Sequence, residues 1–183
     1  MKNKLFLLIL FLCLTALSAE AQNEGTFTDP RDGKTYKTIT IGTQTWMAEN
    51  LAYKANTGCW AYNDDPANVS KYGYLYFYET AKTSCPEGWH LASDMEWSLL
   101  VKFLGGDKLV GSKLKENGFV PLAGGFRNGF GVYSGLGTHG MWWSSTWSTA
   151  MNAWYRLMTF DSSKFEKRSL GKISGFSVRC VKD

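Results

Sequence analysis

The stretch "SDMEWSLLVKFLGG", residues 93–106, constrains the fold most, because it carries the one strong helix pattern in the chain. Ser93 and Glu96 form a capping box, in which the serine hydroxyl bonds the Glu96 amide and the glutamate reaches back. One apolar stripe follows at helical spacing and ends at two glycines: Trp97, Leu100, Val101 and Leu104, then Gly105 and Gly106. Since long helical patterns are otherwise scarce, the rest of the chain is expected to form short strands and loops.

A β-hairpin is predicted in "KTYKTITIGTQTWMAENL", where Ile39 and Ile41 alternate with threonines. The Gly42-Thr43 pair reverses the chain, and the second strand carries Trp46 on one face. From residue 118 onward glycine recurs at nearly every third or fourth place. This half is therefore expected to be a long irregular region with short antiparallel strands, and the whole to be an α+β domain.

The first 21 residues are typical of a secretory signal peptide. Basic residues precede an apolar run over 5–17, and Ala19-Glu20-Ala21 supplies small residues for cleavage before Gln22. The run is too short for a membrane anchor. We therefore expect an extracytoplasmic protein (secreted, periplasmic or on the outer cell surface) without membrane insertion. An N-terminal lead-in is expected over 22–34, flexible over 22–29, and one domain over 35–183.

The net charge of the chain argues against nucleic acid and anionic membranes as partners. Without Lys2, Lys4 and Glu20 of the leader, eighteen basic residues face fifteen acidic ones. This balance is too mild and too evenly spread to predict nucleic acid or an anionic membrane as a partner.

Three cysteines remain after the leader: Cys59, Cys85 and Cys180. In an oxidising compartment we expect one disulfide and one free thiol. Only His90 and His139 could add imidazole, and no CxxC pair occurs, so no zinc site is expected.

Five segments together carry a family resemblance: "DGKTYKTITIGTQTWMAENL", "YGYLYFYETA", "CPEGWHLASDMEWSLL", "WWSSTWSTAMNAWYRLMTF" and "GFSVRCVKD". In this order, over almost the whole mature chain, they resemble the Fibrobacter succinogenes major paralogous domain family. That family is similar to C-type-lectin-like domains, a fold shared with formylglycine-generating enzymes and retroelement-diversified binding proteins. The resemblance implies a C-type-lectin-like domain in which Cys85 and Cys180 are bonded, as the corresponding lectin cysteines are. Cys59 then stays free, because Ala61 and Val69 stand where family members commonly have further cysteines.

Two interpretations compete for "CPEGWHLASDMEWSLL". Cys85 could be a nucleophile with His90 as its base, or half of a disulfide beside a helix cap. A disulfide-bonded sulfur cannot attack, so we expect a structural role and no catalytic residue here. Cys59 lacks an activating base, so an inert thiol is expected there. The copper-binding cysteines of formylglycine-generating enzymes have no counterpart between Gly118 and Phe176, which argues against that chemistry.

Oxygen donors cluster in "YNDDPAN", at Asn63, Asp64, Asp65 and Asn68. A regular calcium-loop spacing is missing, and a turn held by Asx hydrogen bonds is the favoured interpretation. Structural calcium at residues 63–65 stays an open alternative, and no metal or cofactor is predicted.

The candidate ligand-binding residues are Trp147, Asn152, Tyr155 and Arg156. In the retroelement-diversified proteins the varied contacts follow the Trp-Ser-Ser run, which the resemblance places after Trp143. Independently, the polar context "SSTWST" favours an exposed Trp147, and the four side chains combine a flat ring with directional donors. Alternation in "AWYRLMTF" leaves open which side faces solvent. We expect a non-catalytic module that binds a glycan or a protein. The alternatives are an enzyme of formylglycine-generating ancestry and a structural surface protein without a small ligand.

Overall fold

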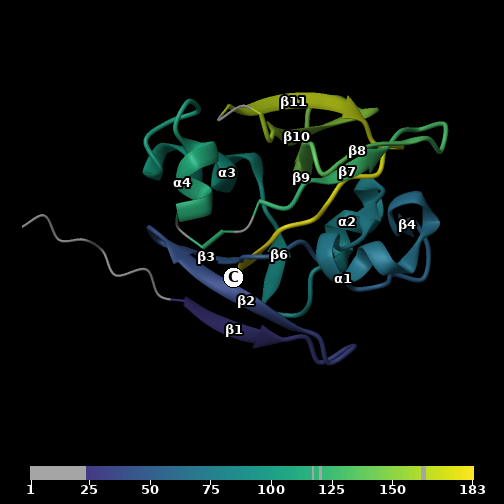
Figure 1. The fold of residues 1–183 in the computed structure, drawn as a ribbon, viewed down its shortest axis with the longest axis horizontal. Helices are drawn as coiled ribbons and strands as arrows, with labels where there is room; N and C mark the ends of the chain where they lie inside the picture. The colour runs from purple at the N-terminus through teal and green to yellow at the C-terminus, as the bar shows by residue number, and fades with distance from the viewer. Residues whose placement is uncertain (1–23, 117, 120, 162–163) are drawn as a thin grey trace, which may run out of the picture.

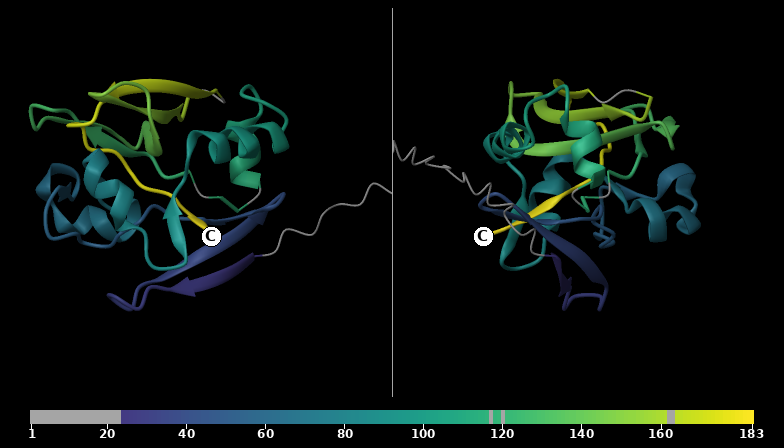
Figure 2. Two further views of the ribbon diagram at one scale, coloured as in Figure 1. Left: turned by 180° about the vertical axis from the view of Figure 1, so that it is seen from behind. Right: turned by 60° about the vertical axis from the view of Figure 1, so that its left-hand side comes forward.

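The computed structural model describes residues 24–116, 118–119, 121–161 and 164–183. The predicted signal peptide lies outside these residues. The described residues form two five-stranded sheets and one two-stranded sheet, with helices between and beside them (Figure 1). Views from behind and from the side show the two larger sheets one above the other (Figure 2). The mixed α+β prediction is confirmed.

The first sheet, at the bottom of Figure 1, contains strands from both ends of the described chain. Its order is β1-β2-β3-β12-β6, and neighbouring strands are antiparallel. The C-terminal strand is central, because Val181 pairs with Trp46 on one side and Cys180 with Leu91 on the other. The strands are β1 (Glu24–Thr28), β2 (Thr35–Ile41), β3 (Gln44–Met47), β6 (Trp89–Leu91) and β12 (Cys180–Lys182).

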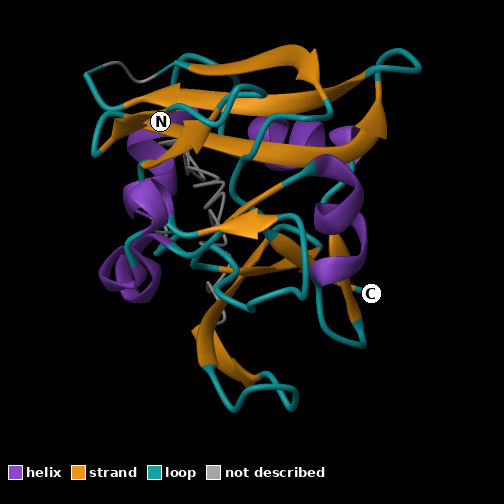
Figure 3. Cartoon of the chain, turned by 90° about the vertical axis from the view of Figure 1, so that its right-hand side faces the viewer, coloured by secondary structure: helices purple, strands orange, loops and turns teal. Residues whose placement is uncertain are grey.

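The hairpin prediction is confirmed, whereas the flexible lead-in is wrong over most of its length. Strands β2 and β3 pair through Ile39 and Trp46 and turn at Gly42, whose φ of +60° suits glycine. Residues expected to be flexible form β1, which pairs with β2 and projects with it at the bottom of Figure 3. This edge strand has one anchoring apolar side chain, Phe27, at 5.1 Å from the Trp89 ring. A strand so poor in apolar residues has almost no sequence signal.

The second sheet has the order β11-β10-β9-β7-β8. Its strands are β7 (Gly124–Arg127), β8 (Tyr133–Leu136), β9 (His139–Trp147), β10 (Asn152–Thr159) and β11 (Phe165–Gly171). They pair antiparallel, except that β7 and β9 are parallel at Gly125 and Gly140. The expectation of antiparallel strands is wrong for this pair, because the chain reverses twice, into β8 and then into β9.

The remaining elements fill the space beside the sheets. The capping box is present: Ser93 Oγ accepts a bond from the Glu96 amide at 3.2 Å, and Glu96 Oε2 accepts one from the Ser93 amide at 2.7 Å. These elements are β4 (Cys59–Trp60), two 3-10 turns (Tyr62–Asp64 and Pro66–Asn68), α1 (Val69–Tyr72), β5 (Leu75–Tyr76), α2 (Tyr78–Ser84), α3 (Asp94–Phe103) and α4 (Val110–Glu116). No helix in the described part of the chain has the length and apolarity needed to cross a bilayer.

Strand β9 separates two hydrophobic clusters. Its neighbouring residues Trp142 and Trp143 are both fully buried and point to opposite faces. Trp142 packs with α3 and the first sheet, at 6.3 Å from Trp97, while Trp143 packs with α2, at 5.5 Å from Tyr78. Both faces of the second sheet are therefore covered at its centre.

Asn50 links the two sheets through its buried side chain. Its Oδ1 accepts hydrogen bonds from Arg179 Nε at 2.8 Å and from Trp142 Nε1 at 2.9 Å. Its Nδ2 donates to the Tyr72 carbonyl at 2.8 Å and to Ser177 Oγ at 3.3 Å. One amide thus joins the end of the first hairpin to β9, to α1 and to the C-terminal segment.

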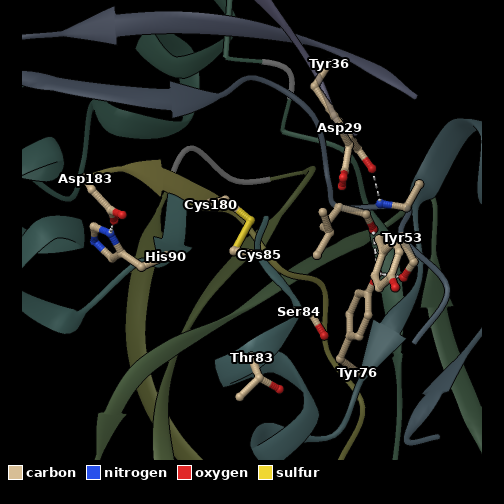
Figure 4. The surroundings of a disulfide bond; sticks show 12 residues. Asp29, Tyr36, Tyr53, Tyr76, Thr83, Ser84, Cys85, His90, Cys180 and Asp183 are labelled. Atoms are coloured by element: carbon tan, nitrogen blue, oxygen red, sulfur yellow. Dashed lines mark hydrogen bonds and ion pairs between the residues drawn. A yellow bond between two sulfur atoms is a disulfide. The ribbon is translucent and has the colours of Figure 1, made fainter. Parts of the chain in front are cut away.

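The disulfide prediction is confirmed: Cys85 and Cys180 are bonded (Figure 4), and Cys59 is a free thiol. The two bonded residues are 95 positions apart in sequence. The bond ties the segment between α2 and β6 to the central strand β12.

We predict that Asn50→Ala lowers the free energy of unfolding by about 2 kcal/mol or more, because each buried donor left unsatisfied costs about 1–3 kcal/mol. Urea denaturation measures the loss. The matched control is Asn68→Ala, which removes one half-buried bond to the Tyr62 carbonyl. Equal urea midpoints for the two variants would contradict the linking role of Asn50.

We predict that Cys85→Ser lowers the melting temperature substantially, while Cys59→Ser leaves it nearly unchanged. The chain-entropy model gives about 4 to 5 kcal/mol for closing a loop of roughly this length. Differential scanning calorimetry measures the shift, and peptide mapping under non-reducing conditions checks the pairing. A bond from Cys59 to Cys85 or Cys180 in the peptide map would refute the assignment.

Candidate functional site

Trp147 lies at the end of β9 and is 64% exposed, which confirms the exposure predicted from its polar context. It pairs with Ala153 on β10, and Ala153 pairs with Leu170 on β11. Directly paired residues lie on one face of a sheet, so these three side chains form a row across three strands. The row exposes an indole and a leucine at its two ends, while Ala153 between them is fully buried.

The loops beside Trp147 add further exposed apolar side chains. Lys172 donates from its backbone amide to the Met151 carbonyl at 3.0 Å, which joins loop 148–151 to loop 171–175. Ile173 in turn lies against Gly129, where an added Cβ would stand 2.6 Å from Ile173 Cδ1. Phe130 in the β7–β8 turn is 95% exposed.

These side chains define a surface that we call the loop-end face. It occupies the end of the second sheet that lies on the right of Figure 1 and faces the viewer in Figure 3. Of the exposed large hydrophobic residues in the described chain, most lie at this end of the sheet, and the others lie on α3 or directly before α4. The loop-end face comprises Phe130, Val132, Trp147, Met151, Leu170 and Ile173.

The structure does not bring the four candidate ligand-binding residues onto one surface. Asn152 is half-buried at the start of β10. Tyr155 is 6% exposed and packs at 4.7 Å from the Phe176 ring, so its expected place on an exposed patch is wrong. Arg156 is 4% exposed and bonds Asp94 Oδ1 at 2.6 Å on the opposite face. Strand β10 is buried on both faces from Tyr155 to Met158, so at its centre neither phase of its alternation reaches solvent.

Phe130 and Met151 were not predicted from the sequence. The signal available for Phe130 is its place in the turn "RNGFGV", where an aromatic residue between two glycines has little chain around it to bury it. Met151 has no comparable signal, because its exposure depends on how loop 148–151 meets Lys172.

Cys85 and His90 do not form a nucleophile–base pair in this structure. Figure 4 shows the Cys85 sulfur bonded to Cys180 and the His90 ring in contact with Asp183. The other ring nitrogen contacts Glu96. Nδ1 lies 2.6 Å from Asp183 Oδ1, and Nε2 lies 2.6 Å from Glu96 Oε1. The imidazole therefore ties the end of the chain to the cap of α3, which is a structural role.

The oxygen donors of the 63–68 loop bond within the protein. Asp65 Oδ1 accepts from the Ala67 amide at 2.9 Å, an Asx turn, and Asn68 Nδ2 donates to the Tyr62 carbonyl at 3.0 Å. Asp64 Oδ1 accepts from the Tyr133 hydroxyl at 2.6 Å. Among the described residues, no three His, Cys, Asp or Glu side chains are grouped to hold a metal ion.

Cys59 is half-buried in β4, and its thiol donates to the Ala55 carbonyl at 3.4 Å. Burial raises the pKa of this thiol, although the bond to Ala55 and the charge of Lys54 oppose the shift. A raised pKa lowers the thiolate fraction at neutral pH, as expected for an inert rather than an activated cysteine.

The described residues thus define a disulfide-bonded α+β domain with an exposed apolar face at the loop end of one sheet. The chain belongs to the Fibrobacter succinogenes major domain family, whose profile matches residues 39–182. The family resemblance drawn from the sequence is confirmed. No curated protein and no solved structure matches the chain.

We predict that the domain loses stability between slightly acidic and alkaline pH through His90. Burial lowers the pKa of His90, but its hydrogen bonds to Asp183 and Glu96 outweigh burial and raise the pKa above 6.5. The stabilisation is therefore fully present below about pH 6.5 and is lost as pH rises through the higher pKa of the folded state.

Urea midpoints at pH 6 and pH 9, compared between the natural chain and His90→Gln, measure this term. The natural chain should lose more stability than the variant over this range. Equal losses would show that His90 does not carry the effect. His139→Gln is the matched control, since it removes the other histidine.

Proposed function

We propose that this protein is a secreted or cell-surface, non-catalytic binding module that recognises a glycan or a protein through the loop-end face. The observation that carries the proposal is the 64% exposure of Trp147 at the same end of the sheet as Met151 and Ile173, which are 74% and 62% exposed. Monomeric proteins rarely leave contiguous apolar patches in water, and such patches commonly mark interaction sites.

The chemistry of the face suits recognition. An indole offers a large, rigid contact area at a low entropic cost, and Trp is among the residues that dominate binding energies at interfaces. The flanking loops are joined by the Lys172 amide, which donates to the Met151 carbonyl, and by the Lys172 ammonium, which donates to the Ala150 carbonyl. Beside them Asn152 pairs with Gly171, so the exposed side chains stand on a fixed support. Preorganised contacts lose less entropy on binding.

The cellular location and the finer fold class belong to the same proposal. A disulfide is typical of proteins outside the cytoplasm, which supports an extracytoplasmic location. The C-type-lectin-like fold is supported by the bond between Cys85, before β6, and Cys180 in the last strand. Strands from both ends of the described chain also share one sheet.

We predict that Trp147→Ala weakens binding of an identified ligand by at least about tenfold, because truncating an interfacial hot-spot residue costs about 2 kcal/mol or more. A glycan array and a peptide-display library identify candidate ligands, and calorimetry measures affinity for the natural chain and the variant. Unchanged affinity in a fully folded Trp147→Ala variant would contradict the proposal.

Two methionines provide a matched control. Met151 on the loop-end face and Met95 on α3 are both 74% exposed. Met151→Ala should weaken binding, and Met95→Ala should leave it unchanged. Equal effects would place the ligand elsewhere.

A further inference from the structure

A second candidate site lies at the opposite end of β11 from the loop-end face. It is a surface bowl of about 460 Å³ between the loop that follows α3 and the start of β11. A backbone bond from the Phe165 amide to the Asp107 carbonyl, at 3.2 Å, joins its two sides. Its volume is in the range of small-molecule sites, about 300–1,000 Å³.

Cationic side chains converge on this bowl. Lys108, Lys164 and Lys167 line it together with Arg156, while Asp107 and Glu166 are its lining carboxylates. Glu166 is already engaged, since its Oε2 accepts two bonds from Arg168 at 2.8 Å and 2.6 Å.

Arg156 differs from the surface lysines of the bowl because its charged side chain is buried. Its side chain is almost fully buried, and Nη2 donates to Asp94 Oδ1, to the Asp94 carbonyl and to Ser98 Oγ, at 2.6, 3.2 and 2.9 Å. Its buried Nε has no hydrogen-bond acceptor among the described residues. An unsatisfied donor on a buried cation is unfavourable, so this guanidinium favours additional negative charge nearby.

One carboxylate, that of Asp94, is shared between two of these cationic side chains. Asp94 serves two cations at once, because its Oδ2 also contacts Lys167 Nζ at 2.7 Å. Burial lowers the pKa of Arg156, and the charges of Asp94 and Asp107 oppose this shift. Guanidinium and ammonium groups arranged in this way are the usual partners of oxyanions.

We propose that this bowl binds a small molecule carrying an oxyanion group (phosphate, sulfate or carboxylate), independently of the loop-end face. Arg156 forms the buried part of the site, and Lys108 and Lys167 contribute exposed charge at its rim. The volume leaves room for the anionic group together with a neighbouring substituent such as a sugar ring.

The test is a chemical-shift titration of the ¹⁵N-labelled protein with inorganic phosphate, inorganic sulfate and glucuronate, at constant ionic strength. Glucose is the neutral control. Saturable shifts at residues 107–108 and 164–167 with at least one anion, and none with glucose, are expected. The anion that binds most tightly identifies the preferred group. The absence of a saturable response to all three anions would overturn the proposal.

Variants separate a site from general attraction to a basic protein. Lys108→Gln and Lys167→Gln should each weaken binding about two- to fivefold, the range for an exposed charge pair. Lys108→Arg should retain binding, and Lys182→Gln, which removes an exposed lysine on β12, should leave it unchanged. Equal losses for Lys182→Gln and Lys108→Gln would overturn the site. Trp147→Ala should not affect anion binding, so failure of the loop-end proposal leaves this result intact.

Discussion

The buried bond between Asn50 and Arg179 is the constraint on which the arrangement of the two sheets depends. Arg179 is fully buried, and burial lowers its pKa to about 9, although the charge of Glu49 opposes this. A cation in a low-dielectric interior is tolerated only where fixed dipoles surround it, and the Asn50 amide supplies one. The same amide bonds Trp142 of the second sheet, so moving either sheet would leave buried donors without acceptors. This network explains how a domain of short strands holds a single arrangement.

A sheet packed on both faces leaves little of its centre for recognition. Trp142 and Trp143 occupy the two sides of β9, and Tyr155 and Arg156 do the same on β10. The most accessible surfaces lie at the two ends of these strands, where the loop-end face and the cationic bowl are found. Rigid strands that present variable loops are a common way to position binding residues. The two surfaces also differ in chemistry, since one is apolar and the other cationic, which suits ligands of different kinds.

The cysteine and the histidine before α3 look like catalytic residues in the sequence, but both have a structural role in the folded protein. Cys85, His90 and Glu96 are near one another in sequence, as a catalytic group could be. In the structure Cys85 ties the segment before β6 to the last strand through a disulfide, and His90 contacts both Asp183 and Glu96, which caps α3. The disulfide and the His90–Asp183 contact each join parts of the chain that are more than 90 residues apart, and Glu96 closes the local helix cap.

Local patterns in the sequence determined the local parts of this protein. The capping box, the apolar stripe of α3 and the turn at Gly42 depend on hydrogen bonds and spacings within a few residues, so the sequence alone predicted them. The polar neighbours of Trp147 likewise predicted its exposure, and the family resemblance supplied the pairing of Cys85 with Cys180. Tertiary structure alone decided whether a strand is covered on one face or two, because that depends on elements distant in sequence. Tyr155 and Arg156 are buried for this reason, and β1 is a strand because β2 offers it an edge. The Asn50–Arg179 bond spans 129 residues, and no local pattern specifies a contact of that range.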